Sequence, residues 1–311
     1  MVNQTQDEAA DGPGGETGRK PRADNAATGG LTPGLWLVAT PIGAARDITL
    51  TALDILATAD VLAAEDTRSL RRLLEIHGVA LAGRPLVAYH DHSGDKVRAR
   101  LLKAMAEGKA VAYAPEAGTA MVSDPGFDLA RAARAAGFAV RSAPGASAAI
   151  TALTLSGLPT DRFLFAGFLP ATAAKRKTAL GELAAVPATL VFYESPRRVA
   201  AALKDAAAVL GGDRRAALCR ELTKKFEQVL TGTLDELAAL AASREIKGEV
   251  VFLVDRGDSG NIREIDVDSA LRAALAGDSV RDAADRVARE TGMKRRDVYQ
   301  RALALAKEID G

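Results

Sequence analysis

The stretch AVAYAPEAGTAMVSDPG, residues 110–126, joins an apolar run to a loop with two glycines and two prolines. AVAYA (110–114) predicts a buried β-strand, because the run is short, apolar and bounded by a turn. Glycine-rich loops after strands often bring the backbone close to a phosphate. This loop instead carries Glu116 and Asp124 and no lysine or arginine. Its charge is therefore unsuited to a phosphate, and the loop alone leaves its ligand open.

Apolar runs and helical segments alternate on both sides of this stretch. Alternation at this length indicates parallel βα units, so residues 34–157 are predicted to form one α/β domain. Asp47 is expected to cap the first helix, and Gly78 to end the second. The predicted strands of this half are residues 35–40, 61–66, 86–90, 110–114 and 139–145.

A second α/β domain is predicted over residues 158–257, after a hinge at Gly157 and Pro159. Two of its strands, 215–222 and 226–232, lie too close in sequence for a helical crossover. We therefore expect them to be antiparallel and the second sheet to be mixed. The other predicted strands are residues 162–169, 188–195 and 248–255.

The two ends of the chain differ from this alternating pattern. Residues 1–33 are polar, rich in glycine and proline and without periodicity, which predicts a disordered extension. A polar linker over 256–261 leads to residues 262–311, which are predicted to form a helix-turn-helix-like tail with its turn at Gly292. The predicted fold class is thus α/β, with two α/β domains and a small helical C-terminal domain.

Composition narrows the class of protein. The 311 residues carry a net charge of +1, which argues against a protein that coats DNA. Cys219 is the only cysteine, so neither a disulfide framework nor a multi-cysteine zinc site is expected. No signal peptide and no membrane-spanning apolar run is found. We expect a soluble, cytoplasmic protein without membrane or DNA partners.

Five polar or glycine-bearing turns follow the predicted strands of the first half. The carboxyl ends of parallel strands meet at one sheet edge, where ligands of α/β proteins bind, so these turns predict a shared cleft. They are TPIG (40–43), EDTR (65–68), YHDH (89–92), the loop 114–126 and PGASA (144–148).

The sequence lacks the common nucleotide-binding and hydrolase motifs. The chain has no GxGxxG, no Walker loop and no GxSxG elbow. His90 and His92 supply two metal ligands and no third, so no metal is predicted, whereas a hydrogen-bonding role stays open. His77 ends a predicted helix, where a structural role is expected. Glu194 and Glu221 follow apolar strands and either face the cleft or are solvated strand ends.

In their order, these motifs resemble the tetrapyrrole methylase-like superfamily. TPIG, AAEDTR, YHDH, EAGT with SDPG, PGASA, FYESP, RELTK and GEVV all occur. The likeness covers about residues 34–256 and is closest to the ribosomal RNA small subunit methyltransferase I family, which the helical tail also resembles. It implies S-adenosyl-L-methionine as methyl donor, bound in a cleft between the two α/β domains, and a homodimer. It also implies 2′-O-methylation of a cytidine in 16S rRNA of the small ribosomal subunit.

The resemblance also implies roles for individual residues. His92 and His90 are the first candidates for a general base and Asp66 the second, while Arg68 or Lys224 would hold an RNA phosphate. The residues implied at the cofactor are Gly43, Gly118, Thr119, Ser123, Asp124, Ser147, Ala148, Tyr193, Leu222, Gly248 and Glu249.

The chain also departs from the family pattern. The family usually has Ser-Asp-Ala-Gly-Thr-Pro where this chain has residues 115–120, PEAGTA. Glu116 keeps the acidic charge with a longer reach, and Ala120 loosens the turn. Two alternatives stay open: a methyltransferase acting on a tetrapyrrole or corrin, and, because of these departures, a non-catalytic RNA-binding factor. The KRR cluster (294–296) is interpreted either as a phosphate contact or as a solvated helix start.

Overall fold

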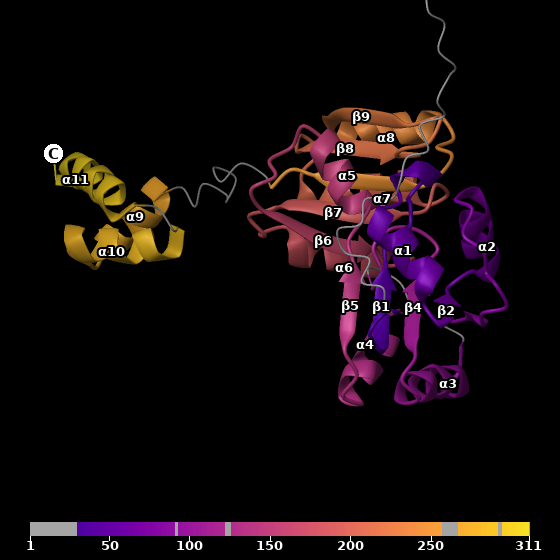
Figure 1. Ribbon diagram of the computed structural model, residues 1–311. Helices are drawn as coiled ribbons and strands as arrows, with labels where there is room; N and C mark the ends of the chain where they lie inside the picture. The colour runs from indigo at the N-terminus through magenta and orange to yellow at the C-terminus, as the bar shows by residue number, and fades with distance from the viewer. Residues whose placement is uncertain (1–29, 91–92, 122–125, 257–266, 292–293, 311) are drawn as a thin grey trace, which may run out of the picture.

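The computed structural model describes residues 30–90, 93–121, 126–256, 267–291 and 294–310 (Figure 1). Most of the predicted extension, most of the predicted linker and Gly292 lie outside these residues. Two five-stranded sheets make up the main body, and three helices follow them. No helix in the described part of the chain is long and apolar enough to cross a membrane.

The first sheet is entirely parallel, with strand order β3-β2-β4-β1-β5. Helices α1 and α2 pack against one face, around Leu56, Leu62 and Leu74. Helices α3 and α4 pack against the other face, around Leu101 and Leu129. The elements are β1 Gly34–Val38, α1 Leu50–Thr58, β2 Val61–Ala64, α2 Thr67–Ile76, β3 Leu86–Ala88, α3 Asp95–Ala106, β4 Ala110–Ala114, α4 Gly126–Ala135 and β5 Val140–Ala143.

The second sheet is mixed, with strand order β6-β7-β10-β8-β9. Only β6 and β7 are parallel neighbours; β10 is antiparallel to β7 and β8, and β8 is antiparallel to β9. The elements are α5 Ala148–Leu155, β6 Phe163–Phe168, α6 Ala173–Leu183, β7 Thr189–Glu194, α7 Val199–Leu210, β8 Arg215–Arg220, β9 Gln228–Thr233, α8 Leu234–Ser243 and β10 Val250–Val254.

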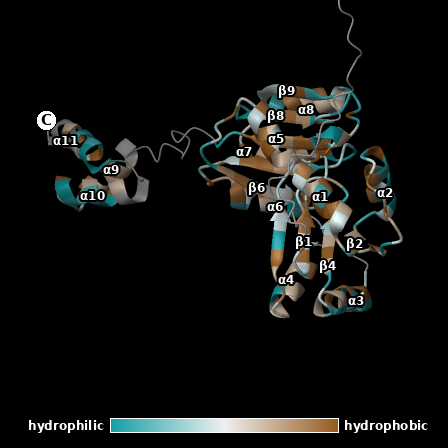
Figure 2. Ribbon diagram, in the orientation of Figure 1, coloured by the Kyte–Doolittle hydropathy of each residue, from teal (hydrophilic) through white to brown (hydrophobic). Residues whose placement is uncertain are grey.

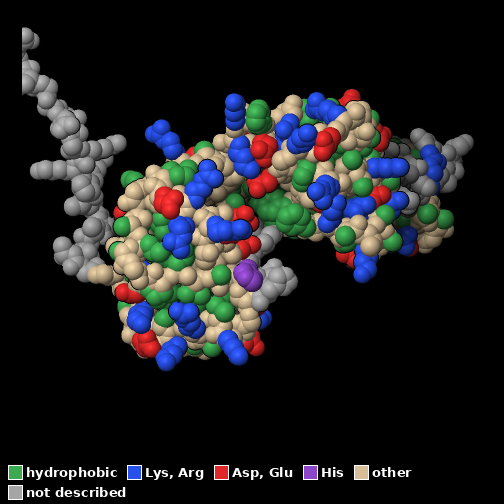
Figure 3. All heavy atoms as spheres, turned by 90° about the vertical axis from the view of Figure 1, so that its right-hand side faces the viewer, with side chains coloured by type: hydrophobic (Ala, Val, Ile, Leu, Met, Phe, Trp, Pro, Cys, Tyr) green, Lys and Arg blue, Asp and Glu red, His purple; other side chains and the backbone are tan. Residues whose placement is uncertain are grey.

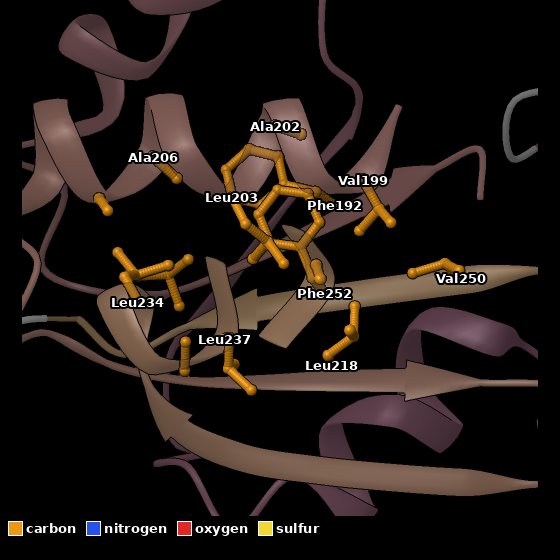
Figure 4. Packing of buried hydrophobic residues seen from close by; sticks show 14 of the residues in the cluster. Phe192, Val199, Ala202, Leu203, Ala206, Leu218, Leu234, Leu237, Val250 and Phe252 are labelled. Carbon is orange, nitrogen blue, oxygen red and sulfur yellow. The ribbon is translucent and has the colours of Figure 1, made fainter. Parts of the chain in front are cut away.

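The second sheet has helices on both faces, and an apolar cluster lies between the sheet and the helices on each face. Phe192 of β7 and Phe252 of β10 stack with ring centroids 4.7 Å apart and pack under α7, as Figure 4 shows. The opposite face is covered by α5, whose Ala152 and Leu153 contact Val191. Because α5 leaves the first sheet and packs on the second, it joins the two halves. Figure 2 shows the resulting arrangement, with hydrophobic residues concentrated on the strands.

The last three helices form a small core of their own. They are α9 Val267–Leu275, α10 Val280–Thr291 and α11 Arg295–Asp310. Leu271, Val287 and Val298 are fully or almost fully buried within this cluster. The helical tail predicted from sequence is therefore confirmed in the described residues.

The predicted fold class is confirmed, with two local corrections. All ten predicted strands occur within two residues of their expected ends, and β8 and β9 are antiparallel as predicted. Asp47, however, does not cap α1: it ends a short 3₁₀ turn, and the Thr49 hydroxyl accepts the Ala52 N–H at 3.1 Å instead. Helix α8 was not predicted, although Thr233 and Glu236 form a capping box at its start.

Candidate functional site

A cavity of about 430 Å³ lies between the two sheets. Figure 3 shows a hollow between the two parts of the molecule, with hydrophobic side chains inside it and acidic ones at its edge. The carboxyl ends of β1, β2 and β4 and the start of α5 form one wall, and β6, β7, β10 and the turn after β8 form the other. The lining residues are Ile42, Glu65, Glu116, Ala117, Gly118, Thr119, Ser147, Ala148, Phe168, Tyr193, Glu194, Ser195, Pro196, Leu222, Glu249, Val250 and Val251.

Hydrogen bonds between three loops hold the first wall together. Thr40 and Gly118 exchange two hydrogen bonds, at 2.9 and 3.0 Å, which tie TPIG to the loop that follows β4. The Thr119 hydroxyl donates to the Ala146 carbonyl at 2.9 Å, which adds the PGASA turn. Gly118 has φ of +80°, and a Cβ there would lie 3.3 Å from the Ile42 side chain. The positive φ thus favours glycine here, and a side chain would also make a tight contact with Ile42.

Tyr193 of β7 crosses the cavity to the first wall. Its hydroxyl accepts the Ala149 N–H at the start of α5, at 3.2 Å. Phe165 and Phe168 meet its ring edge-on, at centroid distances of 4.7 and 5.7 Å. Burial raises the pKa of Tyr193, so the phenol stays neutral. The predicted neighbours Ser147 and Ala148 line the same cavity, and the structure brings all three together.

The RELTK turn places Leu222 in the second wall. Glu221 and Thr223, on either side of it, have positive φ values of 50° and 61°. Such conformations are uncommon for residues with side chains and concentrate at functional sites. The Ala44 N–H donates to the Thr223 hydroxyl at 3.0 Å, which joins the two halves. Gly43 lies at this close approach between the two loops and is not among the lining residues, and its cofactor contact stays a prediction.

Lys224 is held by two carboxylates of the second half. Its ammonium lies 3.1 Å from Glu221 and 3.0 Å from Glu249. Burial alone would lower the pKa of Lys224, but hydrogen bonds to Glu249 and Glu221 raise it above its ordinary value. These partners offset its charge inside the protein and disfavour the predicted phosphate contact. Gly248, at φ of +86°, precedes Glu249 in the turn and does not itself line the cavity.

The charged side chains that line the cavity are acidic. Its lining contains Glu65, Glu116, Glu194 and Glu249, and none of the lining residues in the described part of the chain is lysine, arginine or histidine. Glu194 is fully buried and has an ion pair with Arg198 at 3.1 Å, so its charge is offset. Glu65 accepts the Glu116 N–H at 3.0 Å, which holds both carboxylates at one edge. The cavity suits a cation with apolar parts and disfavours a phosphate.

Of the residues predicted on the substrate side, Asp66, Arg68 and His90 are described, and none of the three lines the cavity. Asp66 caps α2, accepts the Arg68 N–H at 2.7 Å and has an ion pair with its guanidinium at 2.9 Å. These hydrogen bonds lower the pKa of Asp66 to about 2, which makes it a weak base. His90 is exposed, and its backbone N–H donates to the Ser93 hydroxyl at 2.8 Å.

Three predicted site residues, His92, Ser123 and Asp124, lie outside the described residues. Among the described residues, no group of three or more histidine, cysteine, aspartate or glutamate side chains could hold a metal ion. His77, the third histidine, is the C-cap residue of α2, and its Nε2 lies 2.9 Å from the carbonyl oxygen of Ala45 in the preceding 3₁₀ turn, a contact that fits the expected structural role.

Several lining residues were missed from the sequence. Glu65 directly follows β2, and its position at a strand end would have been sufficient to find it. Phe168, in contrast, is the last residue of β6 and has no polar signal. Val250 and Val251 belong to a fully buried strand, and only the arrangement of the second sheet shows that they also border the cavity.

In the helical tail, acidic neighbours neutralise part of the positive charge that was predicted to contact a phosphate. Arg295, the middle residue of KRR, bonds Asp285 through Nη2 at 3.1 Å. Arg286 has an ion pair with Asp278 at 3.0 Å. Lys294 and Arg296 are exposed.

Known protein families and curated relatives match most of this chain. Residues 34–238 match the family of tetrapyrrole (corrin/porphyrin) methylases, and residues 263–306 match the RsmI C-terminal HTH domain. The ribosomal RNA small subunit methyltransferase I of Mesorhizobium japonicum is 46% identical, over 90% of this chain and 95% of that protein. The protein of the same name from Halalkalibacterium halodurans is 40% identical, over 85% of this chain and 93% of that protein.

A solved structure shares the fold. The uroporphyrin-III C-methyltransferase of Thermus thermophilus, complexed with S-adenosylhomocysteine, has a TM-score of 0.50 and 21% identity, over 71% of this chain and 96% of that chain. The two sheets with a cleft between them are therefore those of a methylase fold. The chain belongs to the tetrapyrrole methylase family and, within it, to the ribosomal RNA small subunit methyltransferase I family.

Proposed function

We propose that the protein transfers a methyl group from S-adenosyl-L-methionine to the 2′-hydroxyl of a cytidine in 16S rRNA of the small ribosomal subunit. The names of its relatives support methylation of small-subunit rRNA. The observation that carries the proposal is the cavity between the sheets, which has carboxylates at its edge and no cationic side chain among its described lining residues.

The cavity fits this donor in charge and in shape. S-adenosyl-L-methionine is a sulfonium cation, and when bound it supplies an electrophilic methyl group. Gly118 and Thr119 on one wall, with Tyr193 and Leu222 on the other, would hold its adenosine and methionine parts. The Gly118 backbone can approach closely because no Cβ occupies the space beside Ile42. A phosphate-containing cofactor would face carboxylates instead of cations.

The residues of this chain have two tasks in the transfer. The first is to hold the donor and the acceptor hydroxyl in line, and such positioning accounts for a large part of the rate in reactions of this type. The second is to accept the proton of the ribose hydroxyl, which is worth roughly 10²–10⁴ in rate. Glu65 replaces Asp66 as the carboxylate candidate for this task, because Glu65 lines the cavity and Asp66 has a pKa of about 2. His90 and His92 remain candidates from the neighbouring turn.

The test is methyl transfer from labelled S-adenosyl-L-methionine to three acceptors in parallel: small ribosomal subunits that lack the modification, naked 16S rRNA and uroporphyrinogen. We expect label in rRNA and, after digestion, 2′-O-methylcytidine. Label in uroporphyrinogen alone would support the tetrapyrrole alternative. Subunit binding without any transfer would support the non-catalytic factor.

A matched pair of variants tests the proton acceptor. Glu65→Gln keeps the shape but removes the charge, and we expect kcat to fall by roughly 10²-fold or more, as for loss of a general base. Glu182→Gln, at an exposed position of α6, is the control and should behave as the unaltered enzyme. An unchanged kcat in Glu65→Gln would return the role to the histidine turn.

We further infer that the active form is a homodimer, as the family resemblance implies. Light scattering coupled to size-exclusion chromatography should give about twice the 32.4 kDa mass of one chain. A monomer that methylates rRNA at full rate would remove this part of the proposal.

A further inference from the structure

We propose that the exposed arginine face of α2, formed by Arg68, Arg71 and Arg72, binds the sugar–phosphate backbone of the RNA next to the target nucleotide. The inference rests on the proposed function, because it takes rRNA as the substrate. It adds the surface that receives the substrate outside the cavity.

The helical period places the three arginines on one side of α2. Residues at spacings of three and four lie on the same face of a helix, and Arg71 and Arg72 have these spacings from Arg68. All three residues are exposed. Leu70 and Leu74, by contrast, are buried against the first sheet. The apolar side of α2 is therefore used for packing, and its basic side is left at the surface.

The arginine face begins where the cavity ends. Glu65 lines the cavity, Asp66 caps α2, and the helix starts at the next residue. From Arg68 to Arg72 the helix rises by about 6 Å, so the whole face lies within its first two turns. The pKa of Arg68 is raised chiefly by its hydrogen bond to Asp66, and the charge of the cavity residue Glu116 adds to the effect. Arg68 thus marks the boundary between the acidic cavity and the basic face.

The charge of this face is largely unused within the protein. Arg68 shares its charge with Asp66. Arg71 and Arg72, however, have no ion pair within 4.0 Å with any of the residues that the structure describes. Arg286 and Arg295 of the tail differ in this respect, since each has an acidic partner. Figure 3 views the molecule from the side on which α2 lies in Figure 1, and basic side chains surround the hollow there.

The complementary charges of cavity and face suit a substrate with a phosphate backbone, such as the proposed rRNA. Phosphates are repelled by the carboxylates at the cavity edge and attracted to the guanidinium groups beside it. A single nucleotide would therefore enter the cavity region while the neighbouring phosphates stay outside on α2. Arginine suits this task because its planar group donates two parallel hydrogen bonds to a phosphate.

The experiment measures binding of small ribosomal subunits as a function of salt for two double variants of the full chain. Arg71→Ala/Arg72→Ala removes two charges from the proposed surface. The control, Arg100→Ala/Arg134→Ala, removes two exposed arginines from α3 and α4, on the opposite face of the same sheet. Both variants have the same net charge, so a general charge effect would change them equally.

We expect Arg71→Ala/Arg72→Ala to reduce the slope of log K against log salt by about 1.5, since each lost phosphate contact removes about 0.7–0.9. Its dissociation constant for subunits at low salt should rise by at least roughly tenfold, because a charge-assisted hydrogen bond contributes more than about 1.4 kcal/mol per pair lost. The dissociation constant for S-adenosyl-L-methionine and the urea midpoint should stay unchanged. Arg71→Lys/Arg72→Lys should keep the slope and lose only part of the affinity.

Two results would overturn the inference. The first is an unchanged slope and affinity in Arg71→Ala/Arg72→Ala while the unaltered enzyme methylates rRNA; the proposed function then stands without this surface. The second is an equal loss in the control variant. If the unaltered enzyme neither binds nor methylates small subunits, the proposed function itself fails, and this inference fails with it.

Discussion

Replacing Gly43 by alanine tests how the two halves of the protein meet. A Cβ at this position would lie 2.5 Å from the Thr223 hydroxyl, 2.6 Å from Lys224 Cγ and 2.7 Å from the Leu222 carbonyl oxygen. The Leu222 oxygen belongs to the backbone, so no rotamer change can clear the space. Relief requires the loop and the turn to separate, and this separation weakens the 3.0 Å hydrogen bond from Ala44 N–H to Thr223.

The expected magnitude combines two effects. Overpacking of a tight contact costs about 1–3 kcal/mol. Loss of the hydrogen bond adds about 1 kcal/mol. We therefore expect Gly43→Ala to lower the free energy of unfolding by about 2–4 kcal/mol. Affinity for S-adenosyl-L-methionine should fall as well, because Ile42 and Leu222 of the separated segments both line the cavity.

The assay is urea unfolding followed by circular dichroism, together with calorimetric titration of the methyl donor. Gly181→Ala is the control: it lies inside α6, nothing is within 4 Å of its added Cβ, and it should stabilise the protein by about 0.5–1 kcal/mol. If Gly43→Ala had the urea midpoint and the S-adenosyl-L-methionine affinity of the wild type, the close contact between the Gly43 loop and the turn at 222–224 would be refuted.

Three further changes have defined outcomes. Thr233→Ala removes the cap of α8 and should cost about 0.5–2 kcal/mol in urea unfolding. Asp205→Asn leaves the buried Arg176 without its carboxylate partner at 2.6 Å and should cost about 3 kcal/mol, whereas the double replacement Arg176→Met/Asp205→Leu should recover part of that loss. The folded-state pKa of Asp66 is lowered from 3.8 to about 2, so its contribution to stability is present above pH 4 and is lost as the pH falls toward 2. Asp66→Asn should remove this part of the acid dependence, and an unchanged acid profile would argue against the pair with Arg68.

The patterns in the sequence were sufficient to predict the strands, and they also predicted the sheet edge at which the cavity lies. Short apolar runs separated by helical segments fixed ten strands to within two residues of their ends. Parallel βα units all bring the carboxyl ends of their strands to one edge, so TPIG, the loop after β4 and PGASA had to lie near each other. The ordered motifs also predicted the family, which the comparisons confirm.

Which side chains reach the cavity depends on how the two sheets pack together, so it is seen only in the folded structure. Glu65 lines it while the adjacent Asp66 caps a helix and pairs with Arg68, and two neighbouring carboxylates look alike in the sequence. Gly43 lies where two loops approach closely, and Lys224 has ion pairs with two glutamates, and neither contact could be predicted from the sequence.

The physical reason is the range of the interactions. Helix and strand formation depends on residues a few positions apart, so composition and periodicity record it. The bond from Ala44 to Thr223 spans 179 residues, and no local pattern marks either end. The direction of each side chain at a strand end is set by such contacts between the two halves, and for this reason it becomes known only once both sheets are in place.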